Sequence, residues 1–170
     1  FPWLRRRGGL ALIGLSSAVA SAPGRAVGAV GAAQLDRLAA LLAGARAEGL
    51  CRVVMVHHPP LGGTVRARKR LLDAPALCAV LAQEGVELVL HGHSHRSHHQ
   101  QMETASGVAP VIGVPSASAT RPEAAAWHRY HIAPVAGGWQ VTLTARRHAP
   151  GGMETGHAAT HHLIRAHAEP

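Results

Sequence analysis

Two short histidine-rich segments contain the residues of this sequence best suited to chemistry. The first reads His57-His58-Pro59-Pro60, and the second reads His91-Gly92-His93-Ser94-His95. Each follows a short apolar run that is typical of a buried strand, Cys51 to Val56 and Val86 to Leu90. Ligands of open α/β sheets bind beyond the carboxyl ends of the strands, so the two segments can meet if these strands are neighbours. Imidazole binds zinc, iron, manganese and cobalt well, and the pattern therefore predicts a metal site, with solvated loop histidines as the alternative.

Helices and a further strand are expected around these two loops. Leucines recur at helical spacing between Gly28 and Gly49, which predicts an amphipathic helix. A second helix is predicted from Asp73, a candidate N-cap, to Gly85, a candidate terminator. The apolar run Leu10 to Leu15 predicts a strand before both helices. Strands that alternate with helices indicate the α/β class.

The pattern changes after His99. A strand is predicted at Val111 to Val114, and two antiparallel strands at Trp127 to Ile132 and Trp139 to Arg147. From residue 148 to residue 170 the chain is rich in Gly, Ala and His and shows no periodicity, so a disordered tail is predicted there. One domain is therefore expected over residues 1–147.

Composition excludes several classes of protein. The 170 residues include 17 Lys and Arg against 9 Asp and Glu, a formal charge of +8. The cations are scattered and only 3% of residues are aromatic, so no nucleic-acid surface is expected. Residues 1–22 imitate a secretory signal, but we favour the buried strand, and no apolar run is long enough to span a membrane. We therefore expect a cytoplasmic protein in which Cys51 and Cys78 are buried thiols.

The two motifs resemble a known family. VVMVHHPP at Val53 to Pro60 and ELVLHGHSH at Glu87 to His95 are similar to the C-terminal motifs of the calcineurin-like metallophosphoesterases, and one helix between them also fits. The resemblance implies a four-layer α/β/β/α sandwich with a dinuclear metal centre. It implies that His57 and His93 bind one metal and that His95 binds the other. It places His58 and His91 beside the centre without making them ligands.

Three further motifs of that family, DxH, GDxxD and GNH[DE], are absent from this sequence. They supply the bridging Asp, other ligands and a catalytic His. The sequence has no Asn, and its two aspartates, Asp36 and Asp73, fall in predicted helices. FPWLRRRGGLALIGLSSA resembles the segment that follows GNH[DE], so we interpret the chain as the C-terminal, N-terminally truncated part of the fold.

The resemblance implies a metal-dependent phosphoester hydrolase that acts on small-molecule phosphoesters. Two divalent ions, of manganese, iron or zinc, would be needed, and the class of ester stays open. The serines at two strand ends, Ser16 and Ser17 with Ser116 and Ser118, could line the pocket. A basic cluster after HHPP could attract a phosphate, although a solvated charged loop is the preferred interpretation; it consists of Arg66, Arg68, Lys69 and Arg70.

Two alternatives belong to other classes. The chain could be an inactive half-domain that binds metal weakly, or one that needs the missing half from elsewhere. It could also be a metallo-β-lactamase-like hydrolase, because His93 to His98 approaches an HxHxDH pattern. In that pattern Ser97 stands where an Asp is required, and HHPP is left unexplained.

Overall fold

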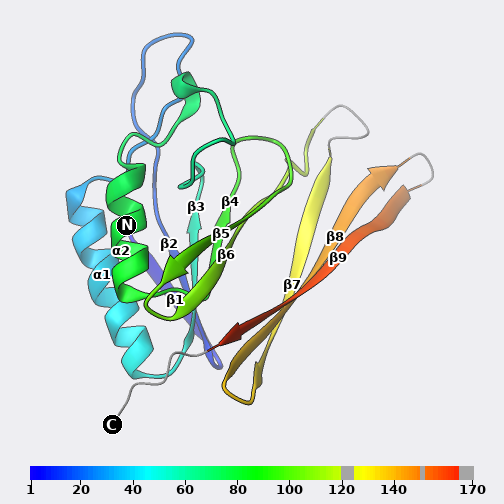
Figure 1. Cartoon of the computed structure of the whole chain (residues 1–170). Helices are drawn as coiled ribbons and strands as arrows, with labels where there is room; N and C mark the ends of the chain where they lie inside the picture. The colour runs from blue at the N-terminus through cyan, green and yellow to red at the C-terminus, as the bar shows by residue number, and fades with distance from the viewer. Residues whose placement is uncertain (120–124, 150–151, 165–170) are drawn as a thin grey trace.

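A computed structural model of the chain describes residues 1–119, 125–149 and 152–164. These residues form an α/β fold whose strands lie in two sheets (Figure 1). In chain order the elements are β1 (Trp3–Arg7), β2 (Leu10–Gly14), α1 (Ala32–Ala47), β3 (Cys51–Val56), the short 3-10 helix η1 (Ala67–Lys69), α2 (Ala74–Glu84), β4 (Leu88–His91), β5 (His98–Thr104), β6 (Gly107–Gly113), β7 (Ala126–Val135), β8 (Gly138–Ala149) and β9 (Gly152–Ile164).

The larger sheet has the strand order β1-β2-β3-β4-β6-β5. Its four central strands, β2, β3, β4 and β6, are parallel, while β1 and β5 pair antiparallel at the two edges. Because the central strands run the same way, their carboxyl ends meet at one edge of the sheet. Both histidine-rich segments start at that edge.

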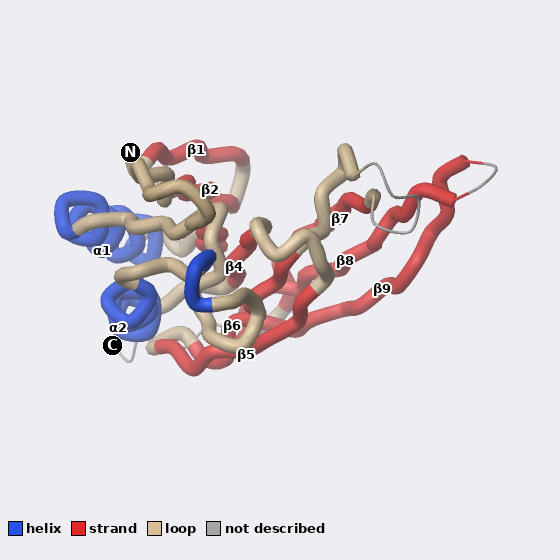
Figure 2. The backbone as a smooth tube through the Cα atoms, turned by 90° about the horizontal axis from the view of Figure 1, so that it is seen from above, coloured by secondary structure: helices blue, strands red, loops and turns tan. Residues whose placement is uncertain are grey.

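Both faces of this sheet are buried, which explains why most residues of its central strands are apolar. Val54 and Val56 on β3 pack with the buried leucines of α1 and α2, whereas Cys51 and Val53 pack with the second sheet. The two helices lie side by side on one face (Figure 2). The predicted α/β class is confirmed.

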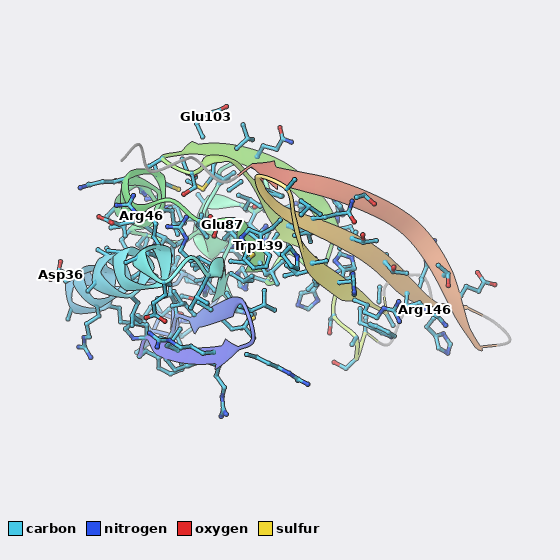
Figure 3. All side chains as sticks on the ribbon, turned by 90° about the horizontal axis from the view of Figure 1, so that it is seen from below. Asp36, Arg46, Glu87, Glu103, Trp139 and Arg146 are labelled. Carbon is cyan, nitrogen blue, oxygen red and sulfur yellow. The ribbon has the colours of Figure 1, made fainter. Side chains whose placement is uncertain are left out.

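The second sheet has the order β7-β8-β9 and covers the other face of the larger sheet. Trp139 on β8 is buried where the two sheets meet, packed in a cluster with Val141 and Leu143 (Figure 3). The described residues thus form three layers, helices on sheet on sheet. No described helix has the length and apolar character needed to cross a membrane.

Several sequence predictions differ from the structure. The edge strands β1 and β5 were not predicted, because Arg5 to Arg7 and His98 to Gln101 look like loop or surface residues. The predicted disordered tail is wrong for residues 148–149, which continue β8, and for residues 152–164, which form β9. The pairing with β8 supplies backbone hydrogen bonds that Gly-, Ala- and His-rich sequence does not reveal. The rest of that prediction, residues 150–151 and 165–170, lies outside the described residues.

Asp73 precedes α2 but makes no side-chain cap for it. Its carboxylate instead accepts hydrogen bonds from the backbone N–H groups of Val30, at 2.9 and 3.0 Å, and of Gly31, at 2.7 Å. Gly31 is the N-cap residue of α1. Asp73 therefore lies at the expected N-cap position, but its side chain serves α1, because a helix start distant in sequence offers the carboxylate two N–H donors and a favourable dipole.

An ion pair is buried at the opposite end of the sheet from the histidines. Arg52 and Glu87 are 2% and 5% exposed, and Glu87 Oε2 lies 3.0 Å from Arg52 Nε and 2.6 Å from the Arg52 backbone nitrogen. The guanidinium also donates to the Glu84 carbonyl, at 2.8 Å, and to the hydroxyl of Ser106. One side chain therefore joins β3 to the end of α2 and to the β5–β6 turn.

Candidate metal centre

The register of β3 and β4 brings the two histidine-rich loops together. Val56 pairs with His91, so the residues that follow each of them leave the sheet side by side. The backbone N–H of Gly92 donates to the carbonyl of His57 at 3.1 Å. A Cβ on Gly92 would lie 3.8 Å from the His57 ring, so this glycine lies in direct contact with His57.

His57 and His93 form a close pair. The distance between His57 Nε2 and His93 Nδ1 is 3.1 Å, and the ring centroids are 4.9 Å apart at 72°. Two imidazole nitrogens that bind one cation through bonds of about 2.1 Å are about 3.0–3.4 Å apart. The side chains therefore fit two ligands of a single divalent ion. The other ring nitrogen of His93, Nε2, is buried and has no hydrogen-bond partner of normal geometry.

The surroundings lower the pKa of both rings. Burial, together with the nearby His58 and His57 rings and then Lys69, lowers the pKa of His93 to about 4. Partial burial and the His58 and His95 rings also lower the pKa of His57. A histidine must be neutral to bind a metal ion, so a lowered pKa extends the pH range of binding downward from the ordinary value.

His95 is near this pair without joining it. Both His93 and His95 have positive φ, 64° and 56°, as a tight turn between the two residues requires. His95 is exposed, and its contact with His57 is electrostatic. Within the described residues, no three or more His, Cys, Asp or Glu side chains are grouped closely enough to hold a metal ion. The structure therefore brings two of the three expected ligands together.

His58 has a different environment. It is 5% exposed, its Nε2 lies 3.2 Å from the Ala26 carbonyl, and its Nδ1 lies 2.8 Å from Ser17 Oγ. The carbonyl can only accept, so Nε2 carries the hydrogen and Nδ1 accepts from the serine hydroxyl. Both nitrogens are thus used, while the ring packs against His93 with centroids 4.1 Å apart. With both nitrogens hydrogen-bonded, the His58 ring presents no free lone pair toward the His57–His93 pair.

Replacing Ser17 with Ala is expected to weaken Zn²⁺ binding by the 170-residue chain about tenfold. Loss of the hydroxyl frees the His58 ring that supports His93, and partners of this kind are worth about 10–100-fold in metal affinity. Calorimetric titration measures the effect, and Ser17→Thr should restore the affinity. The matched control is Ser16→Ala. Equal affinities for Ser17→Ala and wild type, in chains of equal melting temperature, would contradict the assigned role.

An open cavity of 440 Å³ adjoins the pair. Its lining includes His57, His58, His93 and Ser17, together with Arg25. Arg25 was not identified from the sequence, because it lies in the loop after β2 with no recognisable pattern around it. The cavity offers room for a small substrate beside the two histidines.

The basic cluster does not act as one unit. All four side chains are exposed, and backbone bonds from Ala26 N to Arg68 O and from Gly28 N to Arg70 O hold the segment beside the cavity loop. Lys69 is close enough to His93 to lower its pKa. Arg70 lines a separate cavity of 520 Å³ beside Cys78. Lys69 is therefore the cation of this cluster that is best placed for a ligand on the histidines.

Neither aspartate lies at the pair. Asp36 is exposed on the outer side of α1 (Figure 3), and Asp73 is bound to Val30 and Gly31. The buried carboxylate of Glu87 is paired with Arg52 at the far end of the sheet. The two cysteines are free; Cys51 is buried, and Cys78 is only partly buried.

Comparisons with known proteins agree with this geometry. The family model of the calcineurin-like phosphoesterases matches residues 15–97, which include His57, His93 and His95. A crystal structure of a dimetal phosphatase from Danio rerio is similar, with a TM-score of 0.52 and 17% identity over 82% of this chain. The chain spans 40% of the length of that phosphatase chain. No curated protein matches. In residues 15–97 the chain is therefore similar to the calcineurin-like phosphoesterases, and its fold is similar to that of a dimetal phosphatase.

Proposed function

We propose that this chain supplies the histidine side of a dinuclear metal centre in a metal-dependent phosphoester hydrolase. The main support for this proposal is the distance of 3.1 Å between His57 Nε2 and His93 Nδ1. The two residues follow the carboxyl ends of neighbouring parallel strands. The family model covers both residues. His57 and His93 would hold one ion, and His95, exposed on the same loop, would hold the other.

Divalent cations at such a centre supply Lewis-acid charge that activates water and stabilises the phosphoryl transition state. His57 and His93 offer neutral nitrogens from two rigid strand ends. The Ser17–His58–Ala26 hydrogen bonds fix the ring that packs against His93. Lys69 and Arg25 place positive charge beside the cavity, where it favours an anionic phosphoester. The proposal also needs carboxylate ligands, and neither Asp36 nor Asp73 lies at the histidine pair.

The decisive experiment compares two proteins with Mn²⁺ and bis(p-nitrophenyl) phosphate. One is the 170-residue chain, and the other is the same chain extended by the polypeptide encoded upstream of Phe1. We expect negligible turnover by the first and metal-dependent turnover by the second, with DxH, GDxxD and GNH[DE] motifs in the added segment. An extended protein that lacks these motifs and turnover would favour the inactive half-domain, and strong activity of the short chain would refute the need for added carboxylates.

Lys69→Ala in the extended protein is expected to raise KM for an anionic phosphodiester about tenfold with little change in kcat. A hydrogen bond or ion pair to a charged group contributes about 1.5–3 kcal/mol, and the substrate is charged in both ground and transition states. Steady-state kinetics at low ionic strength measure it. Arg66→Ala is the control, because that side chain is also exposed but does not affect His93. Equal KM values for the two variants would refute the role of Lys69.

A further inference from the structure

Two further histidines, His91 and His98, lie on the strands on either side of Gly113. His91 on β4 and His98 on β5 both pair with Gly113 of β6, which runs between them. Residues in register on adjacent strands point to the same face, and the missing side chain of Gly113 leaves room for the His91 ring. A Cβ on Gly113 would lie 2.6 Å from the His91 ring. The ring centroids of His91 and His98 are 6.3 Å apart and nearly parallel, at 23°.

In each of these two histidines, a buried ring nitrogen has no hydrogen-bond partner. His91 Nδ1 lies 3.3 Å from the Gly92 carbonyl, so Nδ1 carries the hydrogen and Nε2 presents a lone pair. That Nε2 atom is buried in a side chain only 3% exposed and has no partner. His98 Nε2 is also buried without a partner. An N–H that donates to a carbonyl while the other nitrogen stays open is the arrangement of metal-bound histidine.

Gln100 adds an oxygen to the same face. It is two residues after His98 on β5, and Met102, two residues further, packs in the helix-side core. The amide nitrogen of Gln100 donates to the Gly62 carbonyl at 3.2 Å, so its Oε1 is the free acceptor. Oε1 is buried and has no partner. Three buried polar atoms on one face thus lack partners, and a cation would satisfy all three if His98 carries its hydrogen on Nδ1.

We propose that His91, His98 and Gln100 bind a divalent transition-metal ion at a site separate from the His57–His93 pair. With bonds of about 2.1 Å, one ion joins two imidazoles whose centroids are up to about 6.5 Å apart when both lone pairs point at it, so the stacked His91 and His98 rings must turn toward the ion on binding. Two imidazoles and an amide oxygen suit copper, nickel or zinc.

The test uses the 170-residue chain with His57→Ala and His93→Ala, which removes the other pair. Cu²⁺ is titrated by calorimetry, and electron paramagnetic resonance counts the nitrogen ligands. We expect one tight Cu²⁺ with nitrogen couplings, weakened at least about tenfold by His98→Ala and less by Gln100→Leu. His99→Ala is the matched control, because His99 alternates to the opposite face of β5 and pairs with Ile112.

Equal Cu²⁺ affinity in the His98→Ala and His99→Ala chains would overturn the proposal and leave water as the occupant. So would the absence of a tight Cu²⁺ site in the double variant. If His98→Ala unfolds by circular dichroism, His98→Gln keeps the polarity and length of the side chain and removes the imidazole. Loss of one nitrogen coupling in His98→Gln, with its folded spectrum retained, supports the site.

Discussion

His93→Ala in the extended protein is expected to lower kcat/KM for bis(p-nitrophenyl) phosphate about a thousandfold. A catalytic ion contributes several kcal/mol of transition-state stabilisation, and each 1.36 kcal/mol is tenfold in rate. His93 is placed for such an effect because its Nδ1 lies 3.1 Å from His57 Nε2 and its ring is packed against His58. Because the ring is neutral, its loss removes a ligand without removing a charge.

Stopped assays with saturating Mn²⁺ measure the rate, and inductively coupled plasma analysis measures bound metal. His131→Ala is the matched control, since His131 is exposed on β7 in the other sheet. We expect the control to keep full activity and metal content. Full activity of His93→Ala would mean that the pair does not hold the catalytic ion, and equal losses in the two variants would point to non-specific metal binding.

Glu87→Gln is expected to destabilise the chain by about 3–5 kcal/mol. The change leaves the Arg52 guanidinium buried without its counter-charge, and breaking a buried pair from one side has a cost of this size. Total stabilities of domains are about 5–15 kcal/mol, so the effect is large. The free energy of unfolding is measured by urea titration with far-UV circular dichroism.

The exposed ion pair between Arg6 and Glu48 provides the control, since its side chains are 53% and 44% exposed. Glu48→Gln should change stability by less than about 1 kcal/mol. The double variant Arg52→Met with Glu87→Leu should recover most of the loss, because it removes both charges. A Glu87→Gln chain as stable as Glu48→Gln would show that the Arg52 charge reaches water.

Strands could be predicted from the sequence where both faces of the strand are buried. β3 was predicted with the bounds found, because Cys51 to Val56 is apolar on both faces apart from Arg52. The edge strand β5 alternates between half-buried and exposed positions and carries His98 to Gln101, so its pairing depends on β6 and not on its own pattern. The strand β9 likewise depends on β8.

The candidate site could be predicted for the residues that closely follow a buried strand. His57 and His93 follow apolar runs and could be placed at one edge of a sheet. The roles of Asp73 and Arg25 could not be predicted from the sequence. Asp73 bonds to a segment far away in the sequence, and Arg25 lies in an irregular loop. Local reasoning assigned Asp73 to its own helix because the competing donors on Val30 and Gly31 belong to another one.

The segment between His58 and Leu72 is fixed at both of its ends to one stretch of chain. His58 is bonded to Ala26, and the backbone N–H of Leu72 donates to the Gly28 carbonyl at 2.8 Å. The length and the sequence of residues 59–67 can therefore change while the rings of His58 and His93 keep their positions. Loops in general tolerate changes of sequence and length better than the elements they connect.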